Sequence, residues 1–556
     1  MSALPEPDDV ARFRRSPDVV MRLSRMGSAH PTRLSFLRSL MRRIQREQWQ
    51  FDRPVWDVNE NGVGRAVYRA KGPDGTYSLV AFSHDLPAAM RTDRVIATAW
   101  DATFALFDGE PTEADLDRLE ANVPLQEAGR ISPRELCLSR ANRSVRLFAH
   151  VVDRLSSGKQ PDRKEVEAVG YLMRTTAVYG SGKFGAADRD QIANRPELSA
   201  PFQAEMLLVW LVRDFTVDIV EHLAAARGGS DAVRLDPEIK RGLGVGNSTG
   251  LGMAPFIVRH PVLLNNWMFA REEALARVRS LKRATPEAIS KLRAALEAAH
   301  ENAAHWHSEH PIQTVKLADL NADLDKISAQ LENWSGPSTH PWDALWTWGE
   351  QTLSLEGQEV LLSLLLEPHG DLVDGLADCM YADEAANFPI DGTMTVGEMK
   401  ALLERNFAWA LGMDFEQPRN VARFWYVSEE KLEPRLGNRQ DDAGAELEQP
   451  LGIAWLAKDL HDALNEVDEQ LTLAEFLLSN PDHRLMARRA QVSLRHPYSE
   501  VRDNLLGHEM LPIDLMRCKL AFFGASRFDP RSDKWVRISL FQDLPYPSEI
   551  SRDHSL

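Results

Sequence analysis

Apolar residues recur at helical spacing over much of the chain, and this pattern predicts a mainly helical protein. The strongest helix is expected at 203–227, where the residues from Met206 to Val212 are apolar on every face. A helix that is hydrophobic all round is buried all round, so we place it at the centre of the core. Gly228 and Gly229 are expected to end it. Further helices are expected at 284–310, 316–333, 350–380, 395–412 and 451–480.

Strand-forming residues gather near the N-terminus, at 63–69, 77–83 and 95–107. The run Gly72-Pro73-Asp74-Gly75 marks a turn between the first two segments, so the pattern predicts a hairpin and a third strand. Residues 112–170 are expected to be helical, with one helix start at Ser132-Pro133-Arg134-Glu135. Short strands are expected at 424–427 and 535–541.

The predicted fold class is therefore mainly α with a small N-terminal antiparallel β-sheet (α+β), built as a multi-helix core around helix 203–227. Four domains are expected from the length and the changes in pattern. They are a basic helical arm at 1–50, a small α+β domain at 51–165, a helical core domain at 166–335 and a mainly helical domain at 336–556. No internal repeat is evident.

Charge and cysteine content exclude several classes of protein. The chain of 556 residues carries 65 basic and 82 acidic residues, a net charge of −17, which argues against a general nucleic-acid binder. Three distant cysteines exclude a disulfide scaffold. The apolar runs fall far short of the roughly 20 residues of a membrane span, and no secretory signal is evident. We expect a cytoplasmic protein, and the excess of arginine over lysine is typical of a bacterial source.

The first candidate site is the polar, glycine-rich segment 174–189. Glycines, cations and hydroxyls at this density can present N–H groups and positive charge to an anion. It is not a phosphate-binding P-loop, since Ala177 and Phe184 stand where that pattern needs glycine and a hydroxyl. Tyr179 and Lys183 are the catalytic candidates, and the substrate-binding candidates are Arg174, Thr175, Ser181 and Arg189. The alternative is a structural loop with a solvated lysine.

The second candidate is the segment 242–255, in which five glycines surround Asn247, Ser248 and Thr249. These three residues are candidate substrate ligands. The dinucleotide fingerprint fails, because Thr249 occupies the place of the third glycine. The alternative is a tight helix–helix crossing that needs glycine. We expect the two glycine-rich segments to meet at one end of helix 203–227 and to form one cationic cleft.

Other clusters have a functional and a structural interpretation. His300, His307 and His310 are candidate metal ligands, against the alternative of a polar helix end. The N-terminal arginines form either a basic surface helix for a membrane or partner, or ion pairs with the acidic remainder. Four tryptophans suggest either an aromatic cage for a cationic ligand or a core: Trp334, Trp342, Trp346 and Trp348.

These features favour a metabolic enzyme for a small anionic substrate, a carboxylate or a phosphate, bound between segments 174–189 and 242–255. One alternative is a non-catalytic scaffold that uses the arginine-rich arm and the tryptophans. Another is a metal-dependent enzyme that uses the histidines at 300–310. No cofactor is identified by the residues, no nucleic-acid or membrane partner is expected, and a homo-oligomer is expected.

Overall fold

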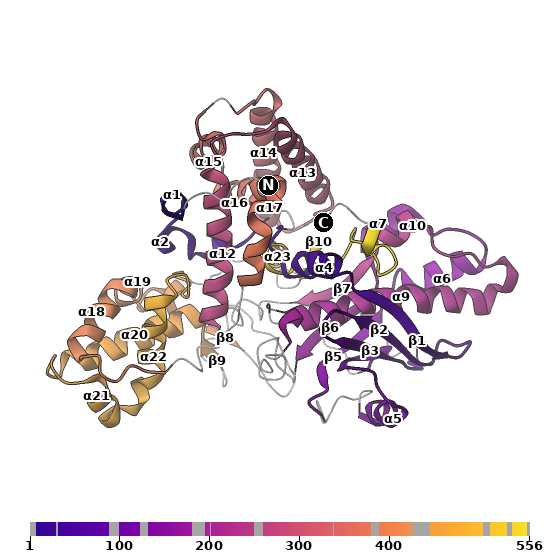
Figure 1. Cartoon of the computed structure of the whole chain (residues 1–556), viewed down its shortest axis with the longest axis horizontal. Coiled ribbons are helices and arrows are strands. Elements are labelled where there is room, and N and C mark those ends of the chain that lie inside the picture. The colour runs from indigo at the N-terminus through magenta and orange to yellow at the C-terminus, as the bar shows by residue number, and fades with distance from the viewer. Residues whose placement is uncertain are drawn as a thin grey trace.

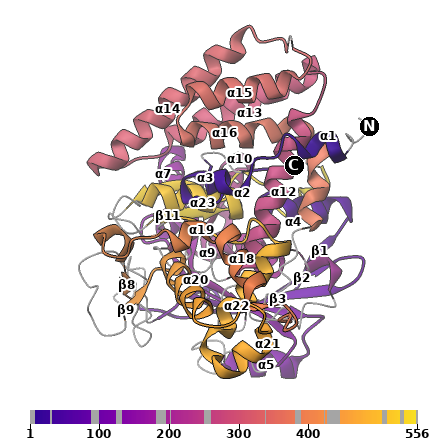
Figure 2. The same cartoon turned by 90° about the vertical axis from the view of Figure 1, so that its left-hand side faces the viewer.

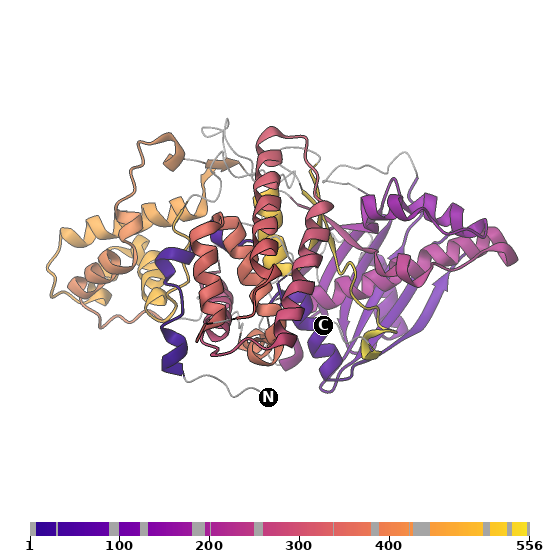
Figure 3. The same ribbon diagram turned by 90° about the horizontal axis from the view of Figure 1, so that it is seen from above.

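A nine-stranded sheet lies at one end of the molecule, a helical bundle in the middle and a smaller helical lobe at the other end (Figures 1 and 3). The computed structural model describes residues 7–28, 32–87, 99–122, 132–180, 195–198, 200, 202–249, 260–336, 338–379, 389–421, 423–425, 445–503, 512–530, 536–552 and 556. The predicted class, mainly α with an antiparallel sheet, is confirmed.

The sheet is larger than expected, and its strand order is β1-β2-β3-β4-β5-β6-β7-β11-β10. The first six strands form an antiparallel meander, β7 joins β6 in parallel, and the late strands β11 and β10 extend the sheet beyond β7. The bounds are β1 (Gln50–Val58), β2 (Gly64–Lys71), β3 (Thr76–Ser83), β4 (Ala102–Asp108), β5 (Glu135–Arg143), β6 (Tyr171–Gly180), β7 (Gly244–Thr249), β10 (Ser526–Pro530) and β11 (Val536–Leu540).

Three expectations about local structure were wrong. The segment from Ser132, predicted as a helix start, leads into β5, whose residues are almost all buried between β4 and β6. Most of the described part of each glycine-rich segment is a strand rather than a loop, since 174–180 and 244–249 pair inside the sheet. The third strand begins at Ala102, later than predicted.

The long helix α9 (Gln203–Gly228) packs across one face of the sheet, from β3 to β7, as its apolar composition predicts. Its core residues include Trp210, Phe215 and Leu208, none of which is measurably exposed. The opposite face carries a smaller apolar cluster, in which Leu116 and Leu119 of α5 (Glu113–Asn122) contact the strands. The prediction of a buried central helix is confirmed. Short helices surround the sheet: α6 (Phe148–Ser156), α7 (Arg163–Val169), η2 (Pro196–Leu198), η3 (Gly229–Asp231) and α10 (Pro237–Arg241).

The helical bundle shares the main apolar core with α9. It begins with α12 (Pro261–Arg279), α13 (Pro286–Ala304), α14 (Pro311–Glu332), α15 (Pro341–Thr352) and α16 (Leu355–Leu366), and ends in the short turns η4 (Glu367–His369), α17 (Gly370–Val373) and η5 (Asp374–Cys379). Prolines at the first helical turn start α12 to α15, where a missing N–H is harmless. Figure 2 shows α13, α14 and α15 together above the rest of the chain.

The N-terminal residues are part of the core rather than a free arm. The apolar side of α4, including Leu37, Leu40 and Ile44, is fully buried. The helices here are α1 (Pro7–Ala11), α2 (Pro17–Val20), α3 (Leu23–Met26) and α4 (Phe36–Arg46), and α23 (Pro512–Phe523) and η9 (Ile550–Arg552) pack near them.

The lobe has a separate apolar core. It contains α18 (Val396–Asn406), α19 (Ala408–Leu411), α20 (Gln449–Asn465), α21 (Leu473–Ser479), η8 (Pro481–His483) and α22 (Arg484–Arg495). The turn η7 (Pro418–Val421) precedes a two-stranded ribbon of β8 (Arg423–Trp425) and β9 (Ala445–Leu447), as the predicted short strand at 424–427 indicates in part. The predicted strand at 535–541 is confirmed as β11.

Candidate functional site

The two glycine-rich segments meet in the sheet. Strand β6 carries the start of the first segment and β7 the middle of the second, and the two strands pair in parallel. Arg174 lies opposite Gly246, and Thr175 lies opposite Asn247. Because parallel strands end at the same edge of a sheet, both segments leave β6 and β7 on the same side. The two segments therefore meet through strand pairing rather than through two loops, and the cationic cleft expected between them stays a prediction.

Side-chain hydrogen bonds join the two strands at this point. The amide of Asn247 donates to the hydroxyl of Thr175 at 3.2 Å, and this hydroxyl donates to the carbonyl of Gly246 at 3.3 Å. Thr175 is fully buried and Asn247 is 8% exposed. Arg174 is also buried, with 4% of its surface exposed. The register places the side chains of Thr175 and Asn247 on one face of the sheet and that of Arg174 on the other, so buried polar groups lie on both faces.

The remaining candidates of these segments are placed less completely. The backbone of Tyr179 pairs with Leu138 of β5, and the backbones of Ser248 and Thr249 pair with Arg537 and Val536 of β11. The side chains of these three candidates lie outside the described residues. The same holds for the whole of Ser181, Lys183 and Arg189, so their roles stay predictions.

Two glycines of β7 have a packing reason. A Cβ atom on Gly246 would lie 2.6 Å from the ring of Tyr171, and one on Gly244 would lie 2.4 Å from the carbonyl of Leu540. Both positions therefore need glycine for close contact between neighbouring strands. This supports the packing alternative for these two residues, although the contact is within a sheet and not between helices.

A buried acid–phenol pair lies at the same edge, and the sequence did not indicate it. Tyr77 of β3 donates a hydrogen bond to Glu197, while the second oxygen of Glu197 (Oε2) is buried without a hydrogen-bond partner among the described residues. Burial and the Glu197 carboxylate raise the pKa of the Tyr77 phenol above its ordinary value. The pair can hold and share a proton, which is the property that acid–base chemistry needs.

Strand register places this pair on the edge where β6 ends. Tyr77 pairs with Asp108 at the end of β4, Phe107 pairs with Glu135 at the start of β5, and Cys137 pairs with Gly180 at the end of β6.

Ion pairs surround the same edge of the sheet. Arg195 bonds to Asp108, and the buried Glu135 accepts from Arg118. The one available sequence signal for this cluster was an acid between proline and leucine just ahead of the apolar helix, at Glu197.

The three histidines proposed as metal ligands do not form a site. Helix α13 ends at Ala304, so His300, His307 and His310 do not share a helical face. His300 contacts the hydroxyl of Ser328 at 3.0 Å, and His310 is the N-cap residue of α14. Across the described ranges, no group of three or more histidine, cysteine, aspartate or glutamate side chains is placed to hold a metal ion.

The arginines of the N-terminus and the tryptophans make contacts within the chain. Arg33 bonds to Asp374 at 2.6 Å and Arg38 to Glu367 at 2.6 Å, which confirms the pairing with the acidic remainder. Trp342 and Trp346 are fully buried, which confirms the interpretation as core. Trp334 and Trp348 are half-buried and pack against the same core. The two features on which the scaffold alternative rested are therefore occupied by internal contacts.

The lobe contains an internal repeat of two turns, although no repeat was expected from the sequence. The turn from Asp391 to Glu398 and the turn from Asp468 to Glu475 have the same hydrogen bonds. In each, the aspartate accepts from the backbone N–H two residues later, and a threonine and a glutamate form a capping box.

The two turns of the lobe are paired by an antiparallel bridge between Thr395 and Thr472. Four backbone hydrogen bonds flank this bridge in two symmetric pairs: Val396 N–H to Leu471 and Leu473 N–H to Met394, then Gly397 N–H to Glu469 and Ala474 N–H to Gly392. The two turns are therefore related by a local two-fold axis.

Each turn matches the last eight positions of the calcium-binding helix–loop–helix pattern, fully in the first and without the glycine in the second. That pattern needs side-chain oxygens at two earlier positions. Pro389 and Leu464 stand at one of these in each turn and have no side-chain oxygen. Glu398 and Glu475 already accept hydrogen bonds from the helix caps. The residues present do not fit a calcium ion.

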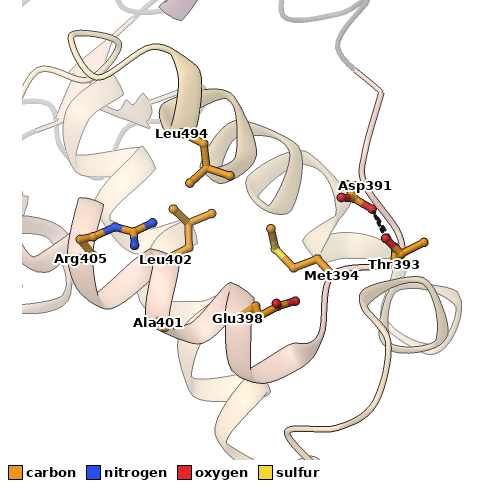
Figure 4. A pocket seen from close by; sticks show the side chains of 8 residues that line it. All are labelled: Asp391, Thr393, Met394, Glu398, Ala401, Leu402, Arg405 and Leu494. Atoms are coloured by element: carbon orange, nitrogen blue, oxygen red, sulfur yellow. Dashed lines mark hydrogen bonds between the residues drawn. The ribbon is translucent and has the colours of Figure 1, made fainter.

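A depression of about 510 Å³ lies beside the first turn (Figure 4). Leu402 and Leu494 point toward each other across it, and Glu398 and Arg405 lie toward opposite ends. Asp391 and Glu398 are exposed and accept hydrogen bonds from the turn. The depression is a mixed apolar and charged surface without a histidine or a cysteine.

No helix in the described part of the chain has both the length and the apolar composition that a membrane crossing requires. No known protein family, curated protein or solved structure was found to match the chain.

Proposed function

We propose that the chain is a metabolic enzyme for a small anionic substrate, a carboxylate or a phosphate, bound at the sheet edge where β6 and β7 end. The observation that supports this most is the parallel pairing of the two polar, glycine-rich segments, in which the buried Asn247 pairs with the buried Thr175. Crevices at the carboxyl ends of parallel strands are common places for ligand binding.

The long helix α9 adds positive electrostatic potential at this edge of the sheet. Its N-terminal end follows Glu197, which is bonded to Tyr77 on the same edge. The positive end of the helix dipole therefore lies toward the proposed site and favours an anion there. The sequence supplies further cations in the first segment, Lys183 and Arg189.

In this proposal, Lys183, Arg174 and Arg189 balance the charge of the substrate, with Thr175 and Ser181 as hydroxyl donors. Asn247, Ser248 and Thr249 orient it by hydrogen bonds. Tyr179 exchanges a proton with the reacting group. The proposal includes a reducing, cytoplasmic environment, which agrees with the two buried free thiols of Cys137 and Cys518.

The experiment is a calorimetric titration of the full chain with inorganic phosphate and with citrate, followed by a turnover screen with the phosphate and carboxylate substrates that bind. Lys183→Ala is expected to weaken binding at least tenfold, and Tyr179→Phe to abolish turnover while leaving binding intact. Lys159→Ala removes an exposed lysine elsewhere and is the matched control. Native mass spectrometry of the same samples measures self-association. Equal binding and turnover in all three variants would overturn the proposal.

A further inference from the structure

A larger cavity lies in the helical bundle, and no described residue of the glycine-rich segments lines it. Its volume is about 990 Å³, at the upper end of the range for small-molecule sites. It lies between the loop 281–285, the first half of α13, and the turns η4 and α17. Figure 1 shows α13 and α17 next to each other in the upper part of the molecule.

Charged groups of both signs line this cavity. The four cations are Arg33, Lys282, Arg283 and Lys291, and the acidic side chains are Glu287, Glu367 and Asp371. Leu556, which also lines it, carries the terminal carboxylate, so the formal charges of the described lining balance.

Most of these charges are already paired. Glu367 accepts from Arg38 and lies 3.8 Å from Arg33, and Glu287 pairs with Lys291 at 2.8 Å. Within the described ranges, no hydrogen-bond or ion-pair partner is found for the side chains of Lys282 and Arg283. These two neighbouring cations are therefore available to an external anion.

His369 provides a buried polar atom in the same wall. Its Nε2 atom is buried and has no hydrogen-bond partner in the part of the chain that the structure describes. Its ring meets the ring of Trp342 edge-on, with centroids 4.8 Å apart, which holds the imidazole in place. Burial, with the nearby Lys291, lowers the pKa of His369 to about 4, so the ring is neutral at pH 7. His369 is therefore a fixed, uncharged part of the cavity wall.

Much of the remaining lining is formed by small or aliphatic side chains. They include Leu281, Ala288, Ala294, Ala295, Pro368 and Leu372. Alanines on the facing side of α13 leave room for a hydrophobic body, and burial of that body adds favourable free energy at about 25 cal/mol per Å². A simple inorganic anion would leave this half of the cavity unused.

We propose that this cavity binds an organic anion with an apolar body. Lys282 and Arg283 hold the anionic group, and the alanine face of α13 contacts the body. This site is separate from the one in the proposed function, and its ligand differs by the required apolar body.

The test uses 8-anilinonaphthalene-1-sulfonate, a fluorescent anion with an apolar body, titrated into the full folded chain. We expect saturable binding that octanoate displaces and inorganic phosphate does not. The double variant Lys282→Ala/Arg283→Ala is expected to weaken binding at least tenfold. Ala295→Trp is expected to block binding by filling the cavity without changing its charge.

The matched control is Arg163→Ala/Lys164→Ala, which removes two neighbouring exposed cations from α7. Melting temperatures of all variants check that the fold is retained. Lys183→Ala is expected to bind the probe as the natural chain does, which separates this proposal from the first one. Probe affinity within twofold in both cavity variants, or displacement by phosphate alone, would overturn the inference.

Discussion

Thr395 and Thr472 lie opposite each other in an antiparallel bridge, and each caps the helix that follows it. The bridge joins two turns that have the same hydrogen bonds, so the lobe is held together by a symmetric pair of helix starts. Helix capping, normally a local effect, is here coupled to the contact between two segments that are distant in sequence.

Removing either cap is expected to destabilise the lobe. Thr395→Ala and Thr472→Ala should each lower the free energy of unfolding of the lobe by about 1 kcal/mol, because each leaves a helix N–H group unsatisfied. Chemical denaturation followed by hydrogen exchange in α18 and α21 measures the effect. Glu398→Gln keeps an amide that can complete the capping box and is the control. Equal stability of both alanine variants and the natural chain would contradict the prediction.

Neither of the two turns is expected to bind calcium. Their glutamates accept hydrogen bonds from the backbone N–H groups of Thr395 and Thr472, and Pro389 and Leu464 supply no oxygen ligand. Thermal unfolding in millimolar calcium and in excess chelator should therefore give the same melting temperature. A rise in melting temperature that saturates at a defined stoichiometry of calcium would contradict this prediction.

A network of buried ion pairs joins the N-terminus to the helical bundle, and we expect it to contribute strongly to the stability of the fold. Arg15 bonds to both Glu272 and Glu359 at 2.7–2.8 Å, and Arg271 bonds to Glu359 at 2.7 Å. Arg15→Ala is expected to cost about 3–5 kcal/mol, because it leaves buried carboxylates without their partner. Arg12→Ala breaks an exposed pair with Asp9 and should change stability by less than about 1 kcal/mol. Denaturant titration of the two variants distinguishes them, and equal losses would contradict the assignment.

The same network predicts a loss of stability in acid. Burial alone would raise the pKa of Glu359, but Arg15 and Arg271 hold it below the ordinary value of 4.5. A carboxyl group with a lower pKa in the folded state stabilises the fold fully above its unfolded pKa and loses that contribution as pH falls. Stability should therefore decline below about pH 4.5, and Glu359→Gln should flatten this part of the pH profile. An unchanged acid limb in that variant would exclude Glu359 as a cause.

Glycine at position 246 is expected to be required for the fold. In Gly246→Ala, the new methyl group would lie 2.6 Å from the Tyr171 ring, and relieving this clash should cost about 1–3 kcal/mol. Gly242→Ala is the matched control, since its Cβ would meet nothing closer than 3.5 Å and its backbone is already in the helical region. Denaturation of the two variants checks the prediction. Equal stability of the two variants would mean that the Tyr171 ring moves aside without cost, and it would contradict the prediction.

The sequence predicts the helices well where apolar spacing alone determines them. Helix α9 was expected at 203–227 and runs from Gln203 to Gly228, because no other element can bury residues such as Trp210 on all sides. Helix α13 was expected to reach residue 310 but ends at Ala304. The residues that follow are mostly polar, so no change in apolar spacing marks the end of the helix in the sequence.

The sheet was harder to predict, because local signals and long-range pairing disagree. Ser132-Pro133 has the composition of a helix start, yet pairing with β4 and β6 makes the following residues a strand. Gly244 and Gly246 resemble a loop in sequence and occupy a buried strand only because their neighbours fit against a bare backbone. The repeat in the lobe consists of short turns far apart, which a search for long repeats does not detect.

The candidate site was predictable in its two segments but not in its acid–phenol pair. The density of glycine and cations identified 174–189 and 242–255, and strand pairing joins them. Tyr77 and Glu197 are separated by more than a hundred residues and belong to no motif, so only the fold brings them together.

The order of strands also has a consequence for synthesis on the ribosome. Strand β7 pairs on its outer side with β11, which begins at Val536. At about 5–20 residues per second, the nascent chain spends roughly 15–60 s with the outer edge of β7 open after that strand has emerged. An open edge is a template for pairing with other chains. Translation arrest before residue 536 should therefore yield aggregation-prone fragments, and a helper that covers this edge would matter during synthesis and not in the finished molecule.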